Sequence, residues 1–259
     1  MFLDSWFRVG RHRRWMAAGL EPDQLQKAQF LPFWGQLAPA DQRRLSGLAR
    51  IFEESKNWEG CGGLAITEEM KSVVAVQACR LILRLQQGDP PGEPFPHVRT
   101  ILMHPSGFFS THEARSADGS VGRRASWNLG EAWPDGKVVL AWDSAYQGGR
   151  KADDGHNLVI HEFAHQLDML DGDADGMLWH PEPADAERWR PIVKREFERL
   201  VAAVERGSKP ILDPYGATSP AEFFAVASEH FFERPRPLRE RHPALYAALA
   251  GYYRQDPAP

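Results

Sequence analysis

Cysteine is scarce in this sequence: the chain has only Cys61 and Cys79 among its 259 residues. Two cysteines exclude a disulfide-dense scaffold and a zinc module built mainly from cysteine. Long apolar runs are also missing, and without about 18 consecutive apolar residues we expect no membrane-spanning helix. The N-terminus lacks the uninterrupted apolar segment of a secretory signal, so we expect a cytoplasmic protein.

Basic residues are not in excess either, because 31 Lys and Arg residues stand against 35 Asp and Glu residues, a net charge of −4 at neutral pH. This balance argues against a nucleic-acid binder that relies on a broad basic surface. The 10 histidines are then the main metal-capable population. With 42% hydrophobic residues, the chain is able to bury a large core as one large domain or two small ones.

Hydrophobic spacing predicts a mostly helical chain with few strands. Helices are expected over residues 20–60 with breaks at Pro32 and Pro39, and over 67–85, 155–170, 184–206, 219–233 and 242–254. Strands are expected over 97–103 and 136–142, and the Gly-, Ser- and Arg-rich residues 106–130 are predicted to form a mobile loop. We expect the first residues of the chain to be frayed or docked on the core. Helices that flank two strands without strict βαβ alternation favour an α+β fold.

Residues 160–168 contain an HExxH motif, formed by His161, Glu162 and His165. On a helix, positions i and i+4 share a face, so both imidazoles are able to bind one zinc ion from the same side. Glu162 stands beside the first histidine and is placed to act as general base toward a zinc-activated water. The residues alone therefore indicate a zinc hydrolase.

A catalytic zinc usually has a third protein ligand, and two residues are candidates. Asp171 stands six residues after His165, where zincins with an extended motif place theirs, but Asp168 occupies the position at which those zincins need glycine. Glu222 follows Ser219, a residue typical of a helix start, and so falls in the first turn of a predicted helix. A carboxylate there is either a zinc ligand or a partner of the helix dipole, and the spacing leaves both interpretations open.

Further features around the motif each have two interpretations. Asp168 is expected to be a solvated helix residue or to orient a ligand, and Glu229 is a second candidate for orienting a ligand. Residues 171–182 match the pattern of a calcium-binding EF-hand loop, although prolines on both sides of Glu182 fit that loop poorly. The strand predicted over 136–142 lies either at a sheet edge, where it can hold an extended peptide, or fully paired in the core.

Two segments resemble the Mlc titration factor A family of bacterial zinc peptidases: VIHEFAHQLDMLDGDADG at 159–176 and YGATSPAEFFAVASEHFF at 215–232. GKVVLAWDS at 136–144 and GHN at 155–157 are also similar to that family. The resemblance extends from about residue 30 to residue 254 and so covers most of the chain. The second segment is more distantly similar to the catalytic domain of anthrax lethal factor.

The resemblance implies roles for individual residues. Glu222 would be the third ligand of one zinc ion, beside His161 and His165, and Glu162 would be the base. Tyr215 would support the transition state, because a phenol is able to donate a hydrogen bond to a developing oxyanion. The implied reaction is hydrolysis of peptide bonds, with aminopeptidase character.

The resemblance also implies an architecture. We expect a single zincin-like domain over 1–259, mostly helical, with a small sheet beside the active-site helix. Its helical N-terminal part would span about 20–90 and its catalytic part about 97–254. The loop predicted over 106–130 and the tail after Tyr253 are candidates for covering the site.

Members of the family are linked to regulation of glucose uptake through the Mlc repressor. The expected partners are therefore a peptide substrate and the Mlc transcriptional repressor, without direct contact to nucleic acid. The alternative function is a regulatory binding module that sequesters a transcriptional repressor, with catalysis secondary or absent. A net charge of −4 is compatible with such a partner, because the repressor is a protein rather than DNA.

Overall fold

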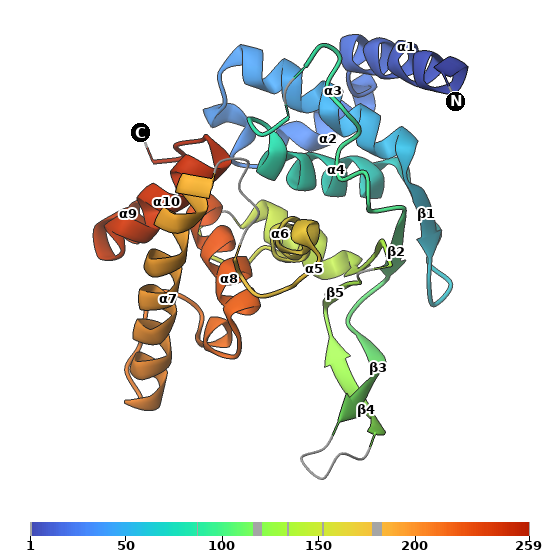
Figure 1. Cartoon of the computed structure of the whole chain (residues 1–259). Helices are drawn as coiled ribbons and strands as arrows, with labels where there is room; N and C mark the ends of the chain where they lie inside the picture. Colours follow the sequence, from blue (N-terminus) through green and yellow to red (C-terminus); the bar gives the residue numbers. More distant parts are fainter. Residues whose placement is uncertain are drawn as a thin grey trace.

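Helices pack beside and above a small mixed sheet, which lies at one side of the molecule, in the computed structural model of the chain (Figure 1). The structure describes residues 2–86, 88–115, 121–133, 135–151, 153–177 and 183–258. The predicted α+β character is therefore present at the level of secondary structure, with helices as the larger part.

Helices fill most of the N-terminal part of the chain. They are α1 (Phe2–Ala18), α2 (Pro22–Gln29), the short 3-10 helix η1 (Trp34–Gln36) and α3 (Pro39–Ser55). The predicted breaks at Pro32 and Pro39 are confirmed, because α2 ends before the first proline and α3 begins at the second. The start of the chain is not frayed: it forms α1, which packs on α3.

Four short strands form the main sheet. They are β1 (Asn57–Gly60), β2 (Thr100–His104), β5 (Gly130–Ala132) and β6 (Lys137–Ala141), arranged in the order β1-β2-β6-β5. The first three are parallel and β5 is antiparallel to β6. Of the two interpretations of the strand predicted over 136–142, the fully paired one is confirmed and the edge position is wrong, since β6 is paired on both sides and β5 is the edge strand. The strand also ends earlier than expected, because Trp142 begins a helix.

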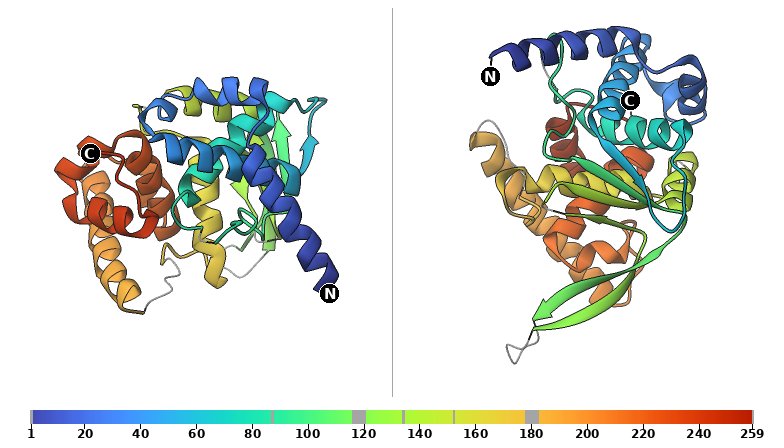
Figure 2. Two further views of the ribbon diagram at one scale, coloured as in Figure 1. Left: turned by 90° about the horizontal axis from the view of Figure 1, so that it is seen from above. Right: turned by 90° about the vertical axis from the view of Figure 1, so that its right-hand side faces the viewer.

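An antiparallel ribbon replaces the mobile loop predicted over 106–130. Its strands are β3 (Phe108–Arg115) and β4 (Val121–Asn128), with Phe108 opposite Asn128 and Arg115 opposite Val121. Both Figure 1 and Figure 2 show this ribbon projecting from the body of the molecule. The loop prediction was wrong because backbone pairing between neighbouring segments does not require an alternating apolar pattern.

Three helices connect the N-terminal part to the candidate site. They are α4 (Glu68–Ile82), α5 (Trp142–Arg150) and α6 (Leu158–Asp168), followed by a 3-10 turn, η2 (Met169–Asp171). Thr67 caps α4 as its sequence predicts, because its side chain accepts a hydrogen bond from the Met70 N–H. Since α4 packs on α3 on one side and on α6 on the other, it joins the N-terminal helices to the motif.

The C-terminal part is helical throughout its described length. It contains α7 (Pro183–Glu205), η3 (Pro214–Ala217), α8 (Pro220–Glu233), α9 (Pro235–Arg241) and α10 (Pro243–Tyr253). The tail after Tyr253 does not cover the motif, because Gln255 donates to the Arg80 carbonyl oxygen of α4 and Ala258 N–H donates to Tyr246 Oη. It is docked on α4 and α10 instead.

The helix that carries HExxH lies in the middle of the hydrophobic core. Phe163 is fully buried, and its ring centroid lies 5.5 Å from that of Phe52 and 4.8 Å from that of Phe95. On its other side α6 packs against α8, whose phenylalanines are also buried. Packing on both sides fixes the direction of the motif side chains. Among the described helices none is long and apolar enough to cross a membrane.

Candidate metal centre

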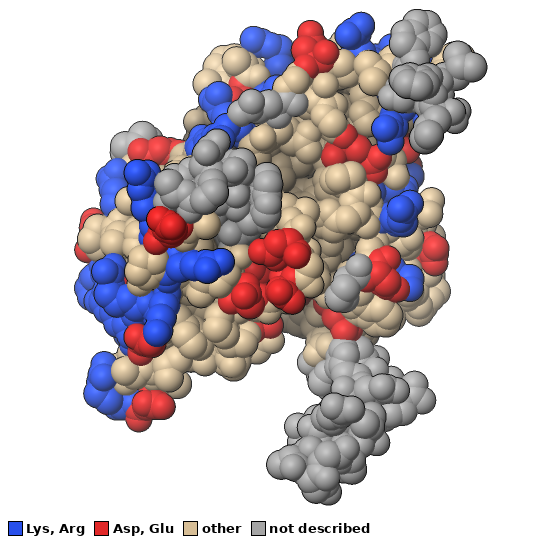
Figure 3. Space-filling view, viewed as in Figure 1, with Lys and Arg blue, Asp and Glu red and all other residues tan. Residues whose placement is uncertain are grey.

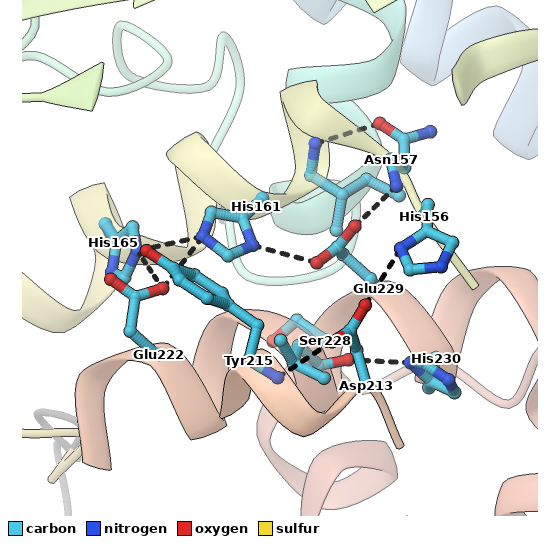
Figure 4. A network of polar contacts seen from close by, with 12 residues as sticks. His156, Asn157, His161, His165, Asp213, Tyr215, Glu222, Ser228, Glu229 and His230 are labelled. Carbon is cyan, nitrogen blue, oxygen red and sulfur yellow. Dashed lines mark hydrogen bonds and ion pairs between the residues drawn. The ribbon is translucent and has the colours of Figure 1, made fainter. Parts of the chain in front are cut away.

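The two motif histidines face the same point from one side of α6. The rings of His161 and His165 lie 4.9 Å apart, and their Nε2 atoms are separated by 3.2 Å (Figure 4). The helix begins immediately before them, where the Asn157 side chain accepts a hydrogen bond from the Ile160 N–H. Asn157 is therefore the helix cap, one turn before the first histidine.

Glu222 completes the group from the first turn of α8. Its Oε2 lies 3.0 Å from Nε2 of His161 and 3.4 Å from Nε2 of His165. Ser219 caps this helix as predicted, because its hydroxyl oxygen accepts from the Glu222 N–H at 3.2 Å. The cap and the first turn thus hold the carboxylate in front of the two imidazoles.

The separations suit one small cation. An ion with tetrahedral ligands at about 2.0–2.1 Å keeps its ligand atoms about 3.3 Å apart, close to the 3.0, 3.2 and 3.4 Å found here. Within the described residues, these three are the one group of histidine and acidic side chains close enough to hold a metal. Asp171, the other candidate ligand, is exposed beyond the end of α6 and outside this group.

The electrostatics of the three side chains are those of a site built for positive charge. Burial raises the pKa of Glu222, but its contacts with His161 and His165 outweigh burial and hold that pKa below its ordinary value. Burial likewise lowers the pKa of His161, and the adjacent Glu222 and Glu229 carboxylates outweigh it and raise that pKa well above normal. Each carboxylate stabilises a positive charge located between the histidines.

Glu229 holds the far side of the first histidine. Its Oε1 lies 2.8 Å from Nδ1 of His161, and its Oε2 accepts from the Asn157 N–H at 2.5 Å. The Asn157 amide in turn donates to Gln77 at 2.9 Å and to Glu233 at 3.1 Å. The proposed role of Glu229 next to a ligand is thus supported by direct contact, and α4, α6 and α8 share one buried polar network.

Glu162 is buried beside this group, under the edge strand. Its side chain is 5% exposed, and burial raises its pKa to about 8. A Cβ at Gly130 of β5 would lie 2.3 Å from Oε1 of Glu162, so only glycine permits this approach. A cavity of about 480 Å³ opens here, and Gly130, His161, Glu162 and Tyr215 are among the residues that line it.

Tyr215 reaches the group from η3. Its ring centroid lies 6.0 Å from that of His161, and its side chain is half exposed. Burial, and then the Glu222 carboxylate to which it hydrogen bonds, raise the pKa of Tyr215 to about 12. The phenol therefore keeps its proton throughout the neutral range and remains a hydrogen-bond donor.

Asp168 differs from the preferred prediction, because it is fully buried rather than solvated. Its Oδ2 accepts from the Gly176 N–H at 3.0 Å, which ties the acidic loop to the end of α6. Gly176 has a φ of +73°, and a Cβ there would lie 2.4 Å from the Pro220 carbonyl oxygen at the start of α8. Gly176 is therefore bonded to the end of α6 and lies against the start of α8. Glu182, which the calcium pattern requires, lies outside the described residues.

Two residues of the site were not predicted from the sequence. Asn157 carried a signal, since an asparagine directly before an apolar helix is a typical N-cap. Gly130 carried none, because its role depends on the distance between β5 and Glu162. The other site residues that were expected together, His161, His165 and Glu222, are together in the structure.

Two histidines and a carboxylate that converge on one point, with a glutamate beside them in an open cavity, define a metallopeptidase-like site. The chain belongs to the glucose-regulated metallo-peptidase family M90, whose profile matches residues 7–254. This membership confirms the resemblance found in the sequence.

Individual relatives agree with this family. An uncharacterized protein of Synechocystis sp. is 38% identical over 229 residues, which cover 88% of this chain and 81% of that protein. Mlc titration factor A of Klebsiella pneumoniae (strain 342) is 32% identical over 235 residues, covering 90% of this chain and 86% of the relative. Mlc titration factor A of Serratia proteamaculans is 32% identical over 238 residues, which cover 90% of this chain and 87% of that relative.

Proposed function

We propose that the protein is a zinc-dependent peptidase with one zinc ion held by His161, His165 and Glu222. The observation that carries the proposal is the set of 3.0–3.4 Å separations between the three ligand atoms. Two nitrogen donors and one carboxylate oxygen are also the donor types that catalytic zinc uses in peptidases. Zinc at this point would supply a Lewis acid that polarises a carbonyl group and lowers the pKa of water.

The remaining steps belong to side chains of this chain. Glu162 takes the proton from the attacking water, since its carboxylate lies in the cavity next to His161. Tyr215 donates its O–H to the oxygen of the carbonyl under attack, and its pKa of about 12 keeps that proton available. β5, which is the edge strand of the main sheet among the described residues, binds the peptide in extended form beside Glu162.

Aminopeptidase character is part of the proposal. Asp154 and Asp213 line the cavity next to His161, and a carboxylate is a suitable partner for the α-ammonium group of a peptide. Peptides with a free amino terminus should therefore be cleaved faster than the same peptides after N-acetylation. Equal rates for the two forms would argue for internal cleavage instead.

The decisive experiment replaces Glu162 with glutamine. Glu162→Gln should abolish hydrolysis of a fluorogenic peptide and leave the zinc content of the purified protein unchanged, because the base is not a ligand. Continued turnover in this variant would refute the assignment of the base. Unchanged zinc content and affinity in Glu222→Ala would refute the assignment of the third ligand.

A second candidate function is binding of the Mlc repressor, and the names of the relatives favour it. If binding is separate from catalysis, Glu162→Gln should bind purified Mlc with unchanged affinity while hydrolysis is lost. Mlc binding that disappears together with hydrolysis would show that the two use the same site. Absence of Mlc binding in the unaltered protein would remove this candidate.

A further inference from the structure

A second, larger cavity lies away from the candidate metal centre. It measures about 920 Å³ and lies between the end of α4, the junction of α8 with α9 and the C-terminal tail. Figure 1 shows the C-terminus on this side of the molecule, next to the N-terminal helices. A volume of this size is within the range of cavities that hold small molecules.

Arg80 is the most unusual residue that lines this cavity. Its guanidinium carbon lies 3.9 Å from the ring centroid of Phe33 and 4.9 Å from that of Phe232, and the residue is only 5% exposed. Nη2 donates to the Phe232 carbonyl oxygen at 3.1 Å. Nη1 has no hydrogen-bond partner among the described residues, since Glu233 Oε1 is 3.9 Å away. A buried guanidinium N–H without an acceptor is costly, and an added acceptor would relieve that cost.

The rim of the cavity adds more positive charge. Arg234, Arg236 and Arg254 line it, and none of them forms an ion pair with a described residue. Four acidic residues also line the cavity. Asp41 is paired with Arg84 at 2.7 Å, Glu233 lies 3.9 Å from Arg80, and Asp256 accepts hydrogen bonds from the tail and from α10; the fourth is Asp153. Figure 3 shows basic side chains gathered on the side of the molecule where α7 and α9 lie. With five arginines against four carboxylates, the charged lining of the cavity is positive by one, in a protein whose net charge is −4.

We infer that this cavity is a binding site for a small phosphate-bearing molecule. Arg234 and Arg236 at the start of α9 and Arg254 in the tail have no ion-pair partner among the described residues, and the five arginines of the lining outnumber its four carboxylates. A phosphate group carries up to two charges and several acceptor oxygens, which suits planar guanidinium donors. Arg80 adds a guanidinium group to the cavity wall, and the rim arginines neutralise the charge of the ligand.

The site is also connected to the metal centre by polar contacts. Glu233, beside Arg80 in the cavity wall, accepts from Asn157 at 3.1 Å, and Asn157 donates to Glu229, which contacts His161. A ligand in the cavity would therefore lie beside Glu233 at the end of α8, the helix whose first turn carries the candidate metal ligand Glu222.

Inorganic phosphate is the probe for the test, with the full chain and constant ionic strength. The unfolding midpoint should rise in a saturable way with phosphate concentration, because a ligand of the native state stabilises it. The double variant Arg236→Ala, Arg254→Asn should bind phosphate about tenfold more weakly or worse. Asparagine is used at Arg254 because that residue has a φ of +52°, which asparagine tolerates. Arg206→Ala, an exposed arginine outside the cavity, is the matched control and should bind like the unaltered protein.

Three results would overturn the inference. The first is the absence of saturable binding, and the second is equal binding by the double variant, which places phosphate elsewhere, for instance at the metal centre. The third is equal stabilisation by sodium acetate, which shows that the cavity does not select phosphate. None of these measurements uses peptide hydrolysis, so they stand apart from the test of the proposed peptidase.

Discussion

Each ring nitrogen of His161 faces a carboxylate: Nε2 faces Glu222 and Nδ1 faces Glu229. If Nε2 binds a metal, Nδ1 carries the ring proton and donates a hydrogen bond to Glu229. This hydrogen bond fixes the tautomer and the orientation of the ring. The second contact does not depend on the metal. The Asn157 N–H at the start of α6 also donates a hydrogen bond to Glu229 and so holds this carboxylate in place.

We expect Glu229→Gln to weaken zinc binding by about 10- to 100-fold. Glutamine removes the negative charge. Its NH₂ group is a hydrogen-bond donor, so it would face either the Asn157 N–H or the Nδ1–H of His161, which are donors as well. Zinc affinity is measured by competition with a chromophoric chelator. Glu205→Gln, an exposed residue at the end of α7, is the control and should leave affinity unchanged. Equal affinities for both variants would contradict the positioning role.

Tyr215→Phe should reduce kcat for peptide hydrolysis by about 10² to 10³, the usual loss for one oxyanion donor. Zinc content should not change, because the phenol is not among the three ligand atoms. Steady-state kinetics with a fluorogenic peptide separates kcat from KM. A change confined to KM would show that Tyr215 binds substrate without stabilising the transition state.

Residue types, spacing and a family resemblance predicted candidate donors for the site, but not their surroundings. HExxH is a local pattern that marks His161 and His165, whereas the spacing left the role of Glu222 open and the resemblance assigned it. Whether Asp168 is exposed to solvent depends on how the chain folds after α6. In the structure the Gly176 N–H donates to the Asp168 carboxylate, and Asp168 is fully buried. Such a contact between neighbouring turns has no periodic signal in the sequence.

At the scale of elements, α4 and α8 have the same type of N-cap but differ in what their first turns carry. Ser219 accepts from the Glu222 N–H at the start of α8, and Thr67 accepts from the Met70 N–H at the start of α4, both at 3.2 Å. Only α8 carries a candidate metal ligand in its first turn. The pair therefore separates the effect of a cap on stability from its effect on the site.

Ser219→Ala and Thr67→Ala should each lower the free energy of unfolding by about 1 kcal/mol. Only Ser219→Ala should also weaken zinc binding, because fraying of the first turn of α8 displaces Glu222. Urea unfolding gives the first quantity and chelator competition the second. An equal loss of zinc affinity in both variants would mean that the ligand turn does not depend on its cap.

A buried carboxylate in α3 makes stability depend on pH. Glu53 is 7% exposed, Oε1 has no hydrogen-bond partner among the described residues, and burial raises its pKa to about 8 from an ordinary value of 4.5. Between these pH values the folded state binds this proton more tightly than the unfolded state does. The contribution of Glu53 to stability is thus complete below pH 4.5 and is lost as the pH rises to about 8.

Glu53→Gln should therefore be more stable than the unaltered protein at pH 9, by roughly 1 to 3 kcal/mol, and should lose this advantage by pH 5. Glutamine keeps an acceptor for Gln24, which donates to Glu53 Oε2 at 3.1 Å. Urea titrations at several pH values measure the difference. Glu54→Gln, at the exposed neighbouring position, should show no such trend.

Elements with a long apolar period were predictable, and so were the strands β2 and β6, whereas β1 and β5 were not. The helices α4, α6, α7, α8 and α10 fall close to their expected ranges. β1 has four residues and falls within the range predicted as helical, and β5 has three residues and begins at the last residue of the predicted loop. Which strand forms the edge depends on pairing between segments 30 or more residues apart, as between β2 and β6, and this information is not local.

For the whole molecule, the candidate metal centre is not what holds α6 against α8. Glu229 and Glu233 of α8 both bind Asn157 at the start of α6, and the two helices share a hydrophobic core. Small metal-dependent domains unfold when the ion is removed because they lack such a core. This chain has contacts that remain without the ion.

Removal of zinc by a chelator should therefore leave the far-UV circular dichroism unchanged. The unfolding midpoint should fall by about 10 °C, the loss expected when a ligand at about 1,000 times its Kd is withdrawn from a chain of this size. Glu222→Ala should show little further change with chelator, since its site is already impaired. Loss of helical signal on chelation would contradict this picture.

The distance along the chain between the candidate ligands has a consequence for the order of folding. His161 and His165 come together as soon as one turn of helix forms, but Glu222 is 61 residues from His161. Bringing Glu222 to the two histidines closes a long loop and costs conformational entropy. Only the packing of α6 against α8 offsets that cost. We therefore expect the candidate third ligand to join the two histidines late, so that a refolding chain gains full metal affinity only when α6 and α8 have packed together.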